Sequence, residues 1–72
     1  MERFLAERYV PQTDVAREAA RLRELASGGD VRLLQTVYVP DDELCFFLFE
    51  SESRERVAQL GRFDRVSTAV TQ

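Results

Sequence analysis

The stretch from Leu33 to Glu50 constrains the fold of this chain more than any other. It contains two runs rich in aliphatic, β-branched and aromatic residues, Leu-Leu-Gln-Thr-Val-Tyr-Val and Leu-Cys-Phe-Phe-Leu-Phe-Glu, separated by Pro-Asp-Asp-Glu. Two such runs around a short Pro/Asp turn are typical of a β-hairpin. With the two aspartates at the tip, Val37 is expected to face Phe46.

Side chains alternate between the two faces of a strand, and this alternation divides the hairpin into two mostly apolar faces. One face is expected to carry Leu34, Thr36, Tyr38, Cys45, Phe47 and Phe49. The other is expected to carry Leu33, Gln35, Val37, Val39, Leu44, Phe46 and Leu48. A solvated antiparallel sheet alternates apolar with polar positions, so both faces of this hairpin are expected to be covered.

The segment before the hairpin predicts one strand and one helix. Residues 2–10 have the composition of a strand that ends at Pro11, which has no N–H to pair. An amphipathic helix is expected from residue 14 to about residue 26, with Thr13 as its N-cap and the Gly28-Gly29 pair at its end. Its expected apolar contacts are Val15, Ala19, Leu22, Leu25 and Ala26.

The segment after the hairpin predicts a short helix and a last strand. Ser53 is the expected N-cap of a helix over residues 54–60, which Gly61 closes. Its apolar contacts are Val57 and Leu60. The last strand begins at Phe63, with Val66 and Val70 on one side.

The predicted order β-α-β-β-α-β indicates a single ferredoxin-like α+β domain over residues 1–72, with a four-stranded antiparallel sheet and two helices on one face. Right-handed crossovers place the first and third strands in the centre. The helices cover only one face, so a monomer would expose the other as an apolar patch. We therefore predict a homodimer that packs sheet against sheet, with a ligand pocket at the interface. The interface residues are Val37, Val39, Phe46 and Leu48.

Composition limits the classes of function. The net charge of -3 and the pI near 4.9 argue against binding to a nucleic-acid backbone. No apolar run is long enough for a signal sequence or a membrane span, so a cytoplasmic protein without a membrane partner is expected. The single cysteine allows no internal disulfide. Histidine is absent, which removes the usual proton shuttle and the commonest metal ligand.

Three polar or phenolic side chains are candidates for binding a small molecule. Glu7 and Gln35 are the polar groups expected in an otherwise apolar pocket between sheets, and Tyr9 is a candidate pocket phenol. Ion pairing of Glu7 within the sheet, and ordinary packing of the tyrosine, are the competing interpretations. No catalytic residue is assigned, because the sequence contains no phosphate-binding glycine loop and no arrangement of a nucleophile with histidine.

The candidate metal ligands are Asp41, Asp42, Glu43 and Cys45. Carboxylate oxygens can hold a hard cation, but acidic residues are also common in solvated turns. The cysteine lies in a phenylalanine-rich strand, where a thiol usually acts as a small hydrophobic side chain.

Residues 1–11, residues 31–50 and the run Phe63-Asp64-Arg65-Val66 resemble a family of small nickel-binding, ferredoxin-like bacterial proteins. The resemblance covers nearly the whole chain, without a single diagnostic motif. It implies the sandwich fold, a homodimer and binding of nickel or a related divalent metal, with no established reaction. Many relatives have His where Gln35 stands, and often a second Cys where Phe47 stands. Imidazole and thiolate are ligands that nickel prefers.

Three functions remain open from the sequence. The first is a dimeric module that holds a divalent metal or a small apolar ligand at or near the interface. The second is a cofactor-free enzyme of the dimeric α/β-barrel kind, such as a monooxygenase or isomerase. The third is a structural accessory subunit that packs its apolar sheet against another protein.

Overall fold

A computed structural model of the chain describes residues 1–70. In chain order the elements are β1 (Glu2–Tyr9), η1 (Gln12–Asp14), α1 (Val15–Leu25), η2 (Ala26–Gly28), β2 (Val31–Val39), η3 (Pro40–Asp42), β3 (Leu44–Ser51), α2 (Arg54–Ala58) and β4 (Arg65–Ala69). The elements labelled η are single turns of 3-10 helix. The predicted α+β architecture, with two α-helices and a four-stranded antiparallel sheet, is confirmed.

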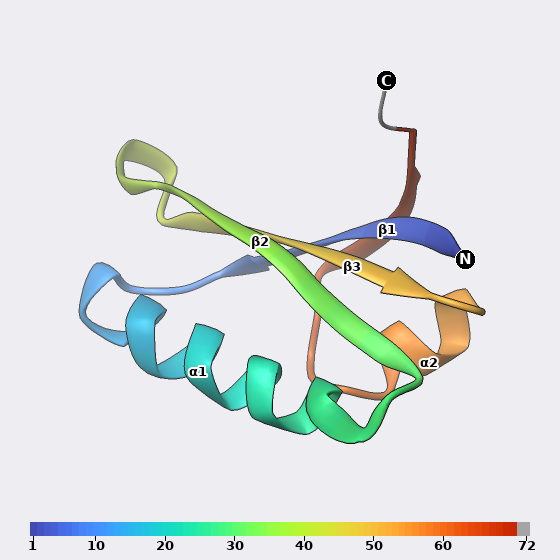
Figure 1. Cartoon of the computed structure of the whole chain (residues 1–72). Coiled ribbons are helices and arrows are strands. Elements are labelled where there is room, and N and C mark those ends of the chain that lie inside the picture. The colour runs from blue at the N-terminus through green and yellow to red at the C-terminus, as the bar shows by residue number, and fades with distance from the viewer. Residues whose placement is uncertain (71–72) are drawn as a thin grey trace.

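The strand order in the sheet is β2-β3-β1-β4, so β1 and β3 are the interior strands and β2 and β4 form the edges. Both α-helices lie below the sheet in the view of Figure 1, and no α-helix lies above it among the described residues. The molecule therefore has two layers, and one face of the sheet has no helix over it.

The core lies between the sheet and the helices. Its fully buried large side chains include Leu22 from α1, Val57 from α2, and Phe47 and Phe49 from β3. Phe63, in the loop before β4, packs near both phenylalanines, with ring centroids 6.1 and 6.0 Å away. Aromatic rings at this spacing and tilt attract each other beyond the gain from burial alone.

The register of the β2–β3 hairpin agrees with the prediction over its outer half. Val37 pairs with Phe46 and Gln35 pairs with Leu48. The register then shifts, because Leu33 pairs with Phe49 and Leu34 is the extra residue of a β-bulge. The prediction that Leu33 shares a face with Gln35 is therefore wrong, and Leu33 packs against the core beneath the helices.

The start of α1 also differs from the prediction. Asp14, rather than Thr13, occupies the N-cap position, and its side chain caps no backbone N–H. The Asp14 carboxylate instead accepts a hydrogen bond from Arg17, at 2.7 Å, so an ion pair has replaced the cap. At the other end, Gly29 has φ of 106°, as expected for the glycine that follows a helix.

Leu25 was predicted to be an apolar contact of the helix, and Val70 to lie on the same side of the last strand as Val66, but both side chains are largely exposed. The Leu25 side chain is 51% exposed, whereas its neighbour Ala26 is buried in the core, so Leu25 lies off the buried side of the helix. Val70 is 83% exposed because β4 ends at Ala69, and the alternation of its strand no longer applies. By contrast, Ser53 caps α2 as predicted, and its Oγ accepts a hydrogen bond from the backbone N–H of Arg56.

Candidate functional site: the open face of the sheet

The face of the sheet opposite the helices carries a continuous apolar area, which we call the open-face patch. Its members are Leu5 from β1, Val37 and Val39 from β2, and Leu44, Phe46 and Leu48 from β3. Val37 is 46% exposed, and the other five are partly exposed. The patch spans three neighbouring strands, because Leu5 and Val37 flank β3 on its two sides.

The four residues predicted at a dimer interface all belong to this patch. Strand alternation assigns Val37, Val39, Phe46 and Leu48 to one face, and the buried residues of β3 face the helices instead. Sequence reasoning did not assign Leu5 to the interface. Its position opposite Leu48 depends on the pairing of β1 with β3, which local patterns do not reveal.

The candidate ligand residues share the open face but do not converge. Glu7 pairs with Phe46 across the ladder, and its carboxylate lies 3.9 Å from the Arg65 guanidinium of β4. Gln35 is exposed on β2, on the far side of β3 from Glu7. Tyr9 is 64% exposed at the end of β1. Glu7 therefore forms an ion pair within the sheet, which was the competing interpretation of this residue, and its partner is Arg65.

The two ends of the open-face patch carry different charges. At one end, Glu50 of β3 lies between Arg3 of β1 and Arg32 of β2, with N–O distances of 3.8 and 3.7 Å. At the other end is the hairpin turn with Asp41, Asp42 and Glu43, all exposed. Within residues 1–70, these three carboxylates form no ion pair.

The candidate metal ligands do not form one group. Cys45 is fully buried on the face that packs against the helices, whereas the acidic turn is exposed beyond the end of the sheet. Burial raises the pKa of the Cys45 thiol, and the negative charge of Glu18 raises it further, so the thiol stays protonated at neutral pH. Among residues 1–70, no three His, Cys, Asp or Glu side chains are close enough to hold one metal ion together.

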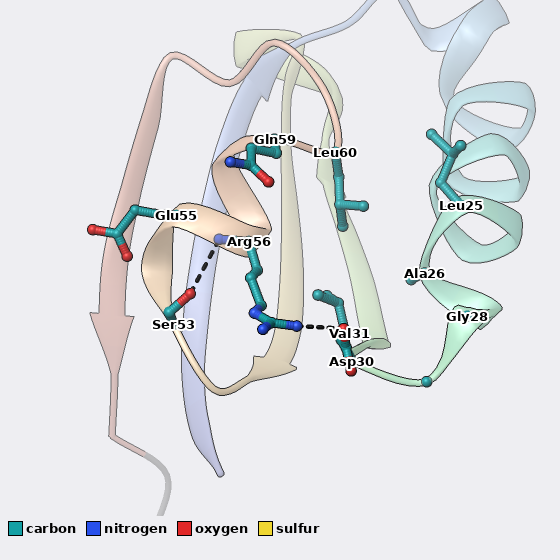
Figure 2. A pocket seen from close by; sticks show the side chains of 11 residues that line it. Leu25, Ala26, Gly28, Asp30, Val31, Ser53, Glu55, Arg56, Gln59 and Leu60 are labelled. Carbon is teal, nitrogen blue, oxygen red and sulfur yellow. Dashed lines mark hydrogen bonds and ion pairs between the residues drawn. The ribbon is translucent and has the colours of Figure 1, made fainter.

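A hollow of about 650 Å³ lies on the helical side of the molecule, away from the open-face patch. Figure 2 shows it between the end of α1 and α2, with Leu25 and Leu60 on facing walls. Arg56 of α2 reaches across to Asp30, with which it forms an ion pair. This hollow could not be predicted from the sequence, because its shape depends on where α2 lies beside the loop after α1.

A second hollow, of about 400 Å³, lies at the arginine end of the sheet. Its lining includes Arg3 and Glu50 but none of the three predicted ligand residues. The larger hollow is not lined by them either. Glu7, Tyr9 and Gln35 thus lie on an open surface, and a second layer above the sheet would be needed to enclose them.

Comparisons of the chain with protein-family models, with curated proteins and with solved structures found no match. Among residues 1–70, no helix combines the length and the hydropathy needed to cross a lipid bilayer.

Proposed function

We propose that the protein is a small binding module of the ferredoxin-like kind that works as a homodimer, in which two open sheet faces pack against each other. The observation that carries this proposal is the open-face patch, which joins apolar side chains from three strands and has no helix above it. Water-exposed apolar patches of this extent commonly mark an interaction surface. A second copy of the chain supplies an identical apolar patch.

The binding role follows from the polar groups around the patch. A second sheet stacked on this face would remove Glu7 and Gln35 from water and leave them as polar groups within an otherwise apolar interface. Few polar groups in an apolar cavity are typical of small-molecule sites. We therefore assign a small, mainly apolar ligand to the interface, with Glu7, Gln35 and Tyr9 as the groups that orient it.

Nickel or a related divalent metal, which the family resemblance implies, is the alternative ligand. Because one copy brings no three suitable side chains together in residues 1–70, a metal at the interface would take ligands from both copies. The Glu7 carboxylates of the two copies are the candidates nearest the patch. This alternative predicts that the metal binds the dimer and not the monomer.

The substitution V37D tests the dimer. A carboxylate at this position would be buried between the two sheets, which is unfavourable without a partner charge, so we expect a monomer. Sedimentation velocity measures the result. The matched control is L25D, because Leu25 is similarly exposed but lies on the helical side. The proposal is wrong if V37D sediments as a dimer, or if L25D dissociates the protein equally well.

A further inference from the structure

The hollow between the end of α1 and α2 has the size and the lining of a small-molecule site. Its volume of about 650 Å³ lies within the range of about 300–1,000 Å³ that ligand pockets occupy. Leu25 and Leu60 lie on facing walls, and the buried side chains of Ala26 and Val31 line its base. Because Leu25 is 51% exposed, a large apolar side chain meets water here. An apolar group placed between the two leucines would remove this surface from water, which is favourable.

One ion pair supplies the charge inside the hollow. The Arg56 guanidinium reaches from α2 to Asp30 and donates a hydrogen bond to its Oδ2 atom. A guanidinium has five N–H donors, and within residues 1–70 the Arg56 side chain donates no other hydrogen bond. The Oδ1 atom of Asp30 accepts none from the same residues. Glu55, the third charged residue that lines the hollow, points away from the pair in Figure 2. The pair therefore presents unused donors beside an unused acceptor.

We propose that this hollow binds a free α-amino acid with an apolar side chain. The carboxylate of the ligand accepts hydrogen bonds from Arg56, and its ammonium group donates to Asp30. Its side chain lies between Leu25 and Leu60. The two protein charges are in direct contact, so the two charges of the ligand must also be neighbours, as they are when one carbon carries both. A simple carboxylate would be repelled by Asp30, and a simple amine by Arg56.

The ion pair leaves room for such a ligand. The Arg56 and Asp30 side chains are 44% and 71% exposed, and exposed ion pairs are weak enough to adjust their geometry. The hollow lies on the helical side of the molecule, so two copies packed through their open sheet faces would leave it uncovered. The inference is therefore independent of the proposed homodimer.

An NMR titration of the isotope-labelled full chain with L-leucine tests the site. We expect saturable shifts of backbone amide signals, confined to residues 25–31 and 53–60. Three probes are matched to L-leucine: isocaproate lacks its ammonium group, isoamylamine lacks its carboxylate, and glycine lacks its apolar side chain. Each should bind about tenfold or more weakly, because each leaves one part of the hollow without its partner.

Substitutions of the ion pair test the two polar contacts separately. R56Q and D30N each remove one charge from an exposed position, and each should raise the dissociation constant of L-leucine about tenfold or more. R54Q is the matched control, because Arg54 is an exposed residue of the same helix that does not line the hollow. Its affinity for L-leucine should equal that of the parent. L25A should reduce the difference in affinity between L-leucine and glycine.

The outcomes separate this site from the proposed dimer interface. The inference is overturned if L-leucine causes no saturable shift up to its solubility limit, or if isocaproate or isoamylamine binds as tightly as L-leucine. Shifts confined to the open-face patch would assign the ligand to the dimer interface and would also overturn it. A monomeric protein that binds L-leucine in the hollow would overturn the proposed homodimer and support this inference.

Discussion

At the scale of single residues, the Glu18 carboxylate has the clearest structural role. Glu18 of α1 accepts hydrogen bonds from Arg21 of the same helix and from Arg8 of β1, both at 2.5 Å. These contacts join the helix to the end of a central strand. The hydrogen bond from Arg21, with the positive charges of Arg8 and Arg21, lowers the pKa of Glu18 despite the opposing effect of its partial burial.

This lowered pKa predicts how stability depends on pH. A carboxyl group whose pKa is lower in the folded state stabilises the fold above its unfolded-state pKa, here near 4.5, and the contribution is lost as pH falls through the folded-state value. We therefore expect E18Q to be less stable than the parent at pH 7, with a smaller loss of stability on acidification below pH 4.5. Urea denaturation at pH 7 and at about pH 3 measures both. A parallel pH dependence in the two proteins would contradict this role.

Some residue roles could be predicted from the sequence and others could not. The core position of Cys45 follows from its neighbours, because Leu44 before it and Phe46 and Phe47 after it favour a buried strand. The partner of Glu7 could not be predicted, since Arg65 is far away in the chain and reaches Glu7 only through the pairing of β1 with β4. Leu33 was misplaced because one bulged residue reverses the alternation of every position beyond it.

At the scale of elements, the end of α1 depends on one glycine of an adjacent pair. Gly29 has φ of 106°, a conformation that disfavours any residue with a Cβ atom. We expect G29A to lower the free energy of unfolding by about 1–2 kcal/mol. G28A is the matched control, because Gly28 has no positive φ and open space around its Cα, so its replacement should change stability little. Equal effects in urea denaturation would show that the turn does not depend on this conformation.

Element boundaries were predictable where a cap or a turn residue marks them. The cap at Ser53 and the turn at Pro40 lie where the sequence predicts them. The 3-10 turns η1 and η2 were not predicted, because single turns have no periodic signal of their own. The expected strand from Phe63 extended to Thr71, of which Thr71 lies outside the described part of the chain. Within residues 1–70, β4 covers only Arg65–Ala69.

At the scale of the whole molecule, the two faces of the sheet are covered unequally. The sequence predicts that both faces of the hairpin are apolar, and the structure has helices on one of them. A chain of 72 residues has a small core, and cores of this size often need a further source of stability such as oligomerisation. A sheet-to-sheet dimer would cover the open-face patch and supply that stability.

The candidate site was only partly predictable from the sequence. Strand alternation placed Val37, Val39, Phe46 and Leu48 on one surface, but it could not show how far apart Glu7 and Gln35 lie. Their separation depends on the strand order, in which β3 lies between them. The hollow beside α2 depends on helix placement, about which a five-residue helix carries little sequence information.

Native mass spectrometry of the unmodified protein, with and without added nickel, tests whether the protein is a ligand-binding homodimer. We expect a mass of twice the 8.3 kDa chain, and an additional bound mass that appears on the dimer and never on the monomer. An increment equal to one nickel ion would identify the metal, and a larger organic mass would identify the apolar ligand. A protein that remains a monomer at every concentration, in either condition, would contradict the claim that two open sheet faces pack together.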